Sequence, residues 1–204
     1  MRIGLVPMAA KPYHAGHHWL VEQASGENDR VLLYVSLTDR KRRGEKPIRG
    51  VDMKRIWAEE IEGILPNNVV PVYGGSPVGH VIDELREAEE RALIGSLDDV
   101  YIVYSDVVDT AKNYDQQTID KYFPTAYAEG NVRFAAEENP ELFTRGAGAP
   151  DISGTSMRSA LQTCDIGAFQ AGLPSGVDAK KVYDILCGGM NEELLRLYVK
   201  SILR

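Results

Sequence analysis

The chain has 204 residues, a hydrophobic fraction of 44% and a formal net charge of −7. This length can bury a substantial core and fits one domain, and the lack of any run of about 18 apolar residues argues against a membrane span. The acidic balance argues against a protein that coats nucleic acid.

Strand-like and helix-like segments alternate along the chain. Apolar runs predict strands at Ile3–Val6, Val31–Leu37, Val69–Tyr73, Asp99–Tyr104 and Val132–Ala135. Helical spacing predicts helices at Trp19–Ala24, Val78–Arg91, Ala179–Cys187 and Glu192–Leu203, with a stop at Gly188–Gly189 between the last two. This alternation is typical of βαβ units, so we expect an α/β fold with a parallel sheet, helices on both of its faces and a C-terminal helical segment.

The segment Lys11-Pro-Tyr-His-Ala-Gly-His17 lies between the first strand and the first helix. The start of a helix attracts anions through its N–H groups and dipole, and Gly16 allows the backbone to approach a ligand closely. Two neutral imidazoles, His14 and His17, can donate hydrogen bonds to phosphate oxygens. The spacing therefore predicts a site for a nucleoside triphosphate.

Two segments resemble the HxGH nucleotidyltransferases of the cytidylyltransferase-like superfamily. Lys11 to His17 is similar to the family's first motif, and Ile152-Ser-Gly-Thr-Ser-Met-Arg158 is similar to its late motif. Lys46 to Ile56 resembles the stretch that follows the family's second strand. The resemblance implies a Rossmann-like core, here residues 1–165, with a C-terminal helical extension of the same domain over residues 166–204.

Three further segments are similar to phage-encoded members of this family. They are Tyr73-Gly-Gly-Ser-Pro77, Tyr104-Ser-Asp106 and Gly172-Leu-Pro174. The resemblance implies a viral origin, and the host cytoplasm as the place where the protein acts.

The resemblance also implies roles for individual residues. His14, His17, Lys11 and Arg158 are the expected catalytic residues, which stabilise charge on the transferred phosphoryl group and on the departing pyrophosphate. The expected nucleotide-binding residues are Pro7, Met8, Ala9, Gly16, Tyr104, Ser105, Asp106, Ser153, Gly154, Thr155 and Ser156. Mg²⁺ is expected to arrive with the triphosphate and to bind mainly through it, without protein ligands.

Each of these features has a second interpretation. His14, His17 and His18 could form a transition-metal site, although adjacent helical residues point about 100° apart, or the histidines could be structural. Ser153 and its neighbours could simply cap a helix. The basic residues Arg40–Arg43, with Lys46 and Arg49, could be a solvated loop, a mobile cover over the phosphates or an RNA contact.

The expected activity is transfer of a nucleoside monophosphate to a small phosphorylated acceptor, with release of pyrophosphate. AMP is favoured over CMP by the Ile-Ser-Gly-Thr form and the Lys-Pro-Tyr-His context. Ala9 stands where many adenylyltransferases have arginine, which puts that arginine's contact in doubt. A non-catalytic nucleotide-binding module and a nucleic-acid contact protein using Arg40–Arg43 remain as alternatives.

The cysteines and the N-terminus bear on location and partners. Cys164 and Cys187 lack metal-ligand spacing, and the first strand starts at the N-terminus, so we expect reduced thiols in a cytoplasmic protein without a signal peptide. The expected partners are the nucleoside triphosphate and the acceptor, with neither a membrane nor a nucleic acid, and the resemblance leaves a homo-oligomer open.

Overall fold

The architecture was obtained from a computed structural model, which describes residues 1–188. Five parallel strands form one sheet in the order β3-β2-β1-β4-β5. The strands are β1 (Arg2–Met8), β2 (Arg30–Val35), β3 (Val69–Tyr73), β4 (Val100–Val103) and β5 (Val132–Phe134). This confirms the predicted α/β Rossmann-like fold, and all five predicted strands are present.

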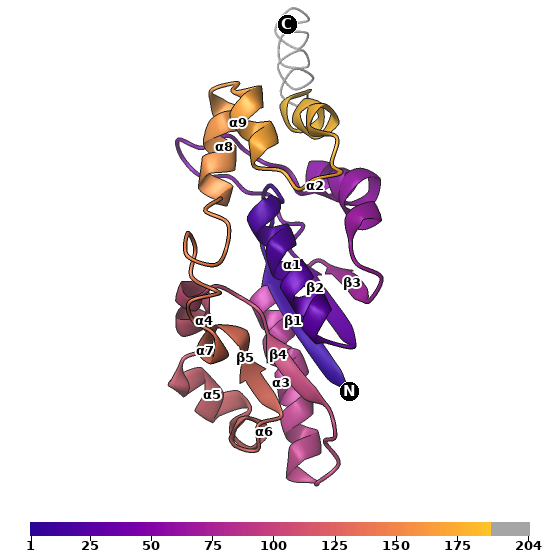
Figure 1. The fold of residues 1–204 in the computed structure, drawn as a ribbon, viewed down its shortest axis with the longest axis vertical. Helices are drawn as coiled ribbons and strands as arrows, with labels where there is room; N and C mark the ends of the chain where they lie inside the picture. Colours follow the sequence, from indigo (N-terminus) through magenta and orange to yellow (C-terminus); the bar gives the residue numbers. More distant parts are fainter. Residues whose placement is uncertain (189–204) are drawn as a thin grey trace, which may run out of the picture.

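Helices connect the strands and cover the sheet (Figure 1). The long ones are α1 (Ala15–Glu27) and α3 (Pro77–Leu93). The 50–64 stretch is α2 (Gly50–Ile56), a π-helical turn η1 (Trp57–Ile61) and a 3-10 turn η2 (Glu62–Ile64). Shorter helices follow β4: α4 (Val107–Asn113), α5 (Gln116–Tyr122), α6 (Pro124–Ala128), α7 (Ala135–Glu138), α8 (Gly154–Gln162) and α9 (Ile166–Ala171).

Both faces of the sheet are buried, as a parallel sheet requires. Neighbouring strand residues alternate between two apolar clusters: Val6 packs with α1, α2 and the C-terminal helices, whereas Leu5 packs with α3, α5 and α6. Leu33 and Tyr34 divide between the two clusters in the same way. The alternation explains why the strands appear in the sequence as continuous apolar runs.

The C-terminal helices lie beyond the carboxyl ends of the strands, at the top of Figure 1. Residues 179–188 are helical, so the helix predicted at Ala179–Cys187 is present and includes Gly188. Gly189, the second residue of the predicted stop, lies outside the described residues. The helix predicted at Glu192–Leu203 lies outside the described residues. Within the described part of the chain, no helix has both the length and the apolar content that crossing a membrane requires.

The sheet order fixes where a ligand can enter. The chain moves outward from β1 to β2 and β3, then returns to the other side of β1 to form β4 and β5. The loops that leave the carboxyl ends of β1 and β4 therefore diverge to opposite sides, which opens a crevice between them.

Candidate functional site

A cavity of about 380 Å³ opens at this switch point. Its volume falls within the range of small-molecule sites, about 300–1,000 Å³. The end of β1, the start of α1, the start of α4 and the start of α8 all contribute residues to its wall. The two motifs recognised in the sequence, about 140 residues apart, therefore meet around one space.

The structure places most of the predicted site residues in the cavity wall. These are Pro7, Met8, Ala9, Lys11, His14, Gly16, His17, Ser105, Asp106, Gly154 and Arg158. Ser153, Thr155 and Ser156 stand at the start of α8 beside the cavity, and they are not part of the wall. Ser153 caps α8 by accepting a hydrogen bond from the Ser156 amide at 3.0 Å, so the capping interpretation describes this pair.

Tyr104 lies away from the cavity. Its side chain is fully buried, its hydroxyl donates to Glu27 at 2.6 Å, and it accepts a hydrogen bond from the Asn28 amide at 2.8 Å. Its position just after β4 predicted a ligand contact. However, strand residues alternate between faces, and the Tyr104 side chain points into the core under α1.

Replacing Tyr104 with phenylalanine should therefore affect stability rather than ligand binding. The change leaves the buried Asn28 amide without its hydroxyl partner, and we expect a loss of about 1–2 kcal/mol in the free energy of unfolding. Urea denaturation measures this loss, and calorimetric titration with ATP and Mg²⁺ should give an unchanged affinity. A tenfold weaker affinity for ATP with unchanged stability would instead indicate that Tyr104 contacts the ligand.

The two histidines of the first motif lie face to face. His14 and His17 stack with ring centroids 3.7 Å apart, and His14 Nδ1 accepts the His17 amide at the start of α1. Tyr13 stacks on the other side of His17, with its centroid 5.7 Å away. A side chain at Gly16 would place its Cβ 3.1 Å from His14 Nδ1, so glycine at this position leaves room for the His14 ring.

Both imidazoles are neutral near pH 7. Burial, with Arg145 and Arg158 nearby, lowers the pKa of His14 to about 4. Burial, His14 and Arg145 also hold the pKa of His17 well below its usual value. Nδ1 of His17 is buried and has no hydrogen-bond partner among the described residues. A neutral imidazole keeps one ring N–H, so His17 can donate a hydrogen bond to a ligand in the cavity.

Four cationic side chains line the cavity: Lys11, Arg40, Arg145 and Arg158. Lys11 donates to Ser36 Oγ at 3.0 Å and to Thr38 Oγ1 at 3.1 Å, and its pKa is lowered by burial and by Arg40. Arg158 is almost fully buried and donates to the Lys11 carbonyl at 2.9 Å and to Thr155 at 2.9 Å. These bonds join the late motif to the first one directly.

Arg145 is the cation that the sequence did not predict. It lies in the loop before α8 and pairs with Asp106 at 2.9 Å. Its guanidinium group lowers the pKa of both His14 and His17, so it stands close to the imidazole pair. A lone arginine in a glycine-rich loop carries no signal of its own, because only the fold brings it to the cavity.

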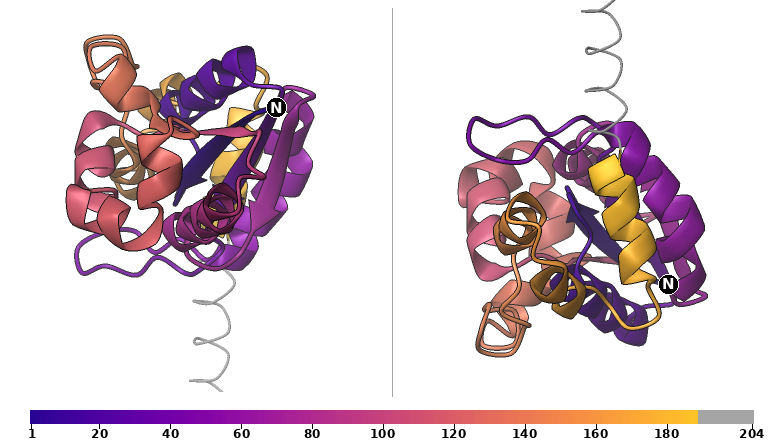
Figure 2. Two further views of the ribbon diagram at one scale, coloured as in Figure 1. Left: turned by 90° about the horizontal axis from the view of Figure 1, so that it is seen from below. Right: turned by 90° about the horizontal axis from the view of Figure 1, so that it is seen from above.

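The loop of residues 39–49, called the basic loop below, borders the cavity through Arg40. Figure 2 shows this loop in dark purple at the edge of the molecule. It starts and ends close to the sheet: the Asp39 carboxylate accepts a hydrogen bond from the Gly50 amide at 2.9 Å. A Cβ at Gly50 would lie 1.7 Å from the Leu37 carbonyl oxygen, so only glycine fits there.

No metal cluster accompanies the histidines in the part of the chain that the structure describes. No group of three or more His, Cys, Asp or Glu residues is placed to hold an ion there. His18 instead contacts the Tyr13 hydroxyl at 3.1 Å and Glu22 at 3.7 Å.

Comparisons with known proteins give one family match and one similar solved structure. A family model, the citrate lyase ligase C-terminal domain, matches residues 3–49, which include β1, the first motif, β2 and the basic loop. No curated protein matches the chain. Among solved structures it is similar to Thermotoga maritima TmcAL bound with alpha-thio ATP, at 15% sequence identity and a TM-score of 0.47. That alignment covers 94% of this chain and 56% of the other, so the chain spans little more than half the length of TmcAL.

Proposed function

We propose that the protein is a nucleotidyltransferase that moves a nucleoside monophosphate from a triphosphate to a small phosphorylated acceptor. The observation that carries the proposal is the meeting of the stacked His14–His17 pair and the buried Arg158 around one cavity. The cavity lies at the switch point of a parallel sheet, where such folds bind nucleotides. The family match over residues 3–49 supports the proposal, because it includes the whole first motif.

The proposed reaction is a direct in-line displacement. An oxygen of the acceptor phosphate forms a bond to the α-phosphorus, the bond from that phosphorus to the bridging oxygen breaks, and pyrophosphate leaves with the electron pair. No covalent intermediate is part of the proposal, and the wall brings imidazoles, cations and helix starts together around the phosphates. Its contribution is to orient the two substrates and to stabilise developing negative charge.

Each group has a role that follows from its position. His14 and His17 donate hydrogen bonds to oxygens of the transferred phosphoryl group. Lys11 and Arg158 attract the β- and γ-phosphates, and Gly154 opens the start of α8 to them. A bound Mg²⁺ would neutralise part of the phosphate charge, and the acceptor would enter on the side of Pro77, Asp109 and Asn113.

A second candidate differs only in the acceptor. The matched family is described as a ligase, which favours a carboxylate as the acceptor. Its oxygen would attack the same α-phosphorus, pyrophosphate would leave, and the product would be a mixed anhydride of the acyl group and the nucleoside monophosphate. The cavity wall suits both reactions, because the charge that develops on the phosphoryl oxygens and on pyrophosphate is the same.

A ligand screen tests the proposal. In the presence of Mg²⁺, we expect ATP to raise the melting temperature most and CTP to raise it less. GTP and UTP should raise it least. Pyrophosphate release is then measured with a pool of phosphorylated acceptors and, separately, a pool of carboxylic acids, and mass spectrometry identifies the product. Tight triphosphate binding without pyrophosphate from either pool would favour the non-catalytic module. Salt-sensitive RNA binding that is lost when Arg40–Arg43 are neutralised would favour the nucleic-acid alternative.

A further inference from the structure

One carboxylate in the basic loop holds two of the cations near the cavity. Glu45 Oε2 lies 3.0 Å from Arg40 Nε and 2.9 Å from Arg158 Nε, and Glu45 Oε1 lies 3.3 Å from the second nitrogen of Arg40. Both arginines line the cavity, whereas Glu45 itself does not. The two guanidinium groups hold the pKa of Glu45 below its usual value, so it is ionised near pH 7.

The Glu45 carboxylate lies between two guanidinium groups, as a bound phosphate group would. Guanidinium groups bind carboxylates and phosphates through the same charged N–H donors, so a carboxylate between two arginines can stand in for a phosphate group. Without an anion, Arg40 and Arg158 would repel each other, because Arg40 lowers the pKa of Arg158. Glu45 therefore neutralises a cation pair that the fold otherwise leaves close together.

The loop that carries Glu45 has an exposed tip between two ends that are held in place. Arg40 and Ile48 exchange two backbone hydrogen bonds of 2.8 and 3.0 Å, and Ile48 is buried in the core. Between them, residues 41–44 are exposed, and Gly44 adopts a φ of +81° that makes the turn. Glu45 can thus leave the cation pair while Ile48 stays packed.

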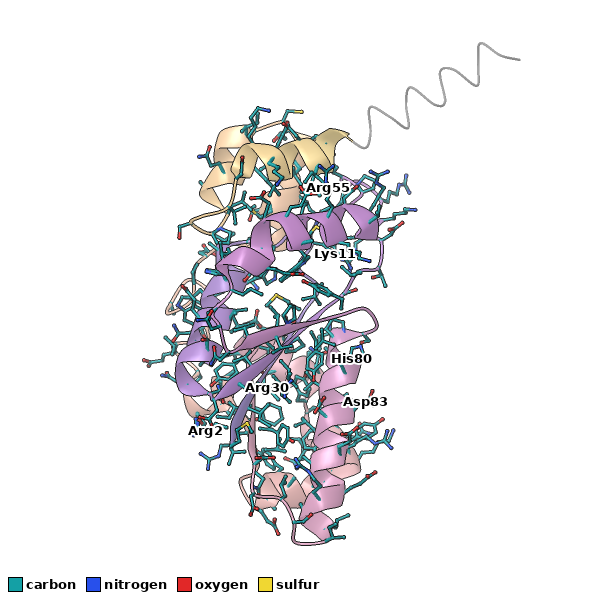
Figure 3. The ribbon with its side chains drawn as sticks, turned by 90° about the vertical axis from the view of Figure 1, so that its right-hand side faces the viewer. Arg2, Lys11, Arg30, Arg55, His80 and Asp83 are labelled. Carbon is teal, nitrogen blue, oxygen red and sulfur yellow. The ribbon has the colours of Figure 1, made fainter. Side chains whose placement is uncertain are left out.

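The cation pair lies next to the proposed phosphate site. Arg158 also donates to the carbonyl of Lys11, and the Lys11 ammonium group reaches Ser36 and Thr38 at the end of β2. Figure 3 shows Lys11 on the side of α2 toward the sheet and Arg55 on the opposite side, toward the helix at 179–188.

We propose that Glu45 is an internal occupant of a phosphate subsite between Arg40 and Arg158, and that the polyphosphate of a bound nucleotide displaces it. The inference rests on the proposed function, since it requires that the cavity bind a polyphosphate. A triphosphate carries several negative charges against the single charge of Glu45, so it competes successfully at sufficient concentration. The displacement weakens nucleotide binding in the natural chain and releases the tip of the basic loop when the nucleotide arrives.

The test compares two carboxylates of similar surroundings. Glu59 is also paired with two cations, Arg55 at 2.8 Å and Lys181 at 3.1 Å, but neither of these cations lines the cavity. Glu45→Gln and Glu59→Gln change the net charge equally. We expect Glu45→Gln to bind inorganic tripolyphosphate, and ATP with Mg²⁺, about 3- to 10-fold more tightly than the natural chain, as measured by calorimetric titration. Glu59→Gln should bind both as the natural chain does.

Each outcome is decisive. Equal or weaker affinity in Glu45→Gln than in the natural chain overturns the inference and leaves the proposed function standing. Absence of tripolyphosphate and ATP binding in all three proteins overturns both. If Glu45→Gln does not fold, Glu45→Asp replaces it, because this variant keeps the charge but shortens the side chain. A smaller gain in affinity for tripolyphosphate and ATP is then expected. An unchanged affinity in Glu45→Asp counts against the inference.

Discussion

Replacing His17 with alanine is expected to reduce the rate of pyrophosphate release by about two orders of magnitude or more. The imidazole stacks between His14 and Tyr13, and its buried Nδ1 lacks a partner among the described residues. A neutral imidazole that this packing holds in the cavity wall contributes most when charge develops on the phosphoryl oxygens. The rate is measured with ATP, Mg²⁺ and the acceptor that the product analysis identifies.

His80 provides a matched control. It also stacks on a tyrosine, Tyr34, with a centroid distance of 5.5 Å, but it lies on α3 and outside the cavity wall. His80→Ala therefore removes a stacked imidazole without touching the proposed chemistry, and its turnover should stay within about twofold of the natural chain. Unchanged turnover in His17→Ala, with ATP still bound, would reject the role assigned to His17.

The fold was predictable where the apolar pattern is strong. The strand predicted at Val69–Tyr73 has the observed bounds, and the other four agree with the structure to within a few residues at each end. The helices α4 to α7 were not predicted from the pattern, because each has seven residues or fewer and shows less than two turns of periodicity. The division into residues 1–165 and 166–204 stays a prediction.

The site residues that belong to a sequence motif could be predicted. The residues that only tertiary contacts bring to the site could not. His14, His17, Lys11 and Arg158 could be named because their spacing resembles a family pattern. Arg145 and Glu45 could not, since their partners Asp106 and Arg158 lie 39 and 113 positions away in the chain. Such pairs are set by packing, and a single sequence holds no record of them.

The buried imidazoles should make the folded state sensitive to acid. An unfolded histidine has a pKa near 6.5, whereas burial with Arg145 and Arg158 nearby lowers the pKa of His14 to about 4. Between these values the unfolded state binds more protons than the folded state, so stability falls as the pH falls from 7 toward 4. This shift of the His14 pKa alone corresponds to a decrease of about 3 kcal/mol in the free energy of unfolding by pH 4. His17, whose pKa is also lowered, acts in the same direction.

The variant His14→Asn isolates this effect. Asparagine is a good helix N-cap, so it keeps an acceptor for the His17 amide at the start of α1 while removing the titrating ring. We expect the free energy of unfolding, measured in urea at pH 7, 6, 5 and 4, to fall more steeply in the natural chain than in the variant. The difference between the two curves should open below pH 6.5 and reach roughly 2 kcal/mol at pH 5. Carboxylates titrate in both proteins and cancel in that difference, so parallel curves would show that His14 is charged or exposed in the folded state. A saturating triphosphate should reduce the difference, because the phosphate charges favour the protonated imidazole.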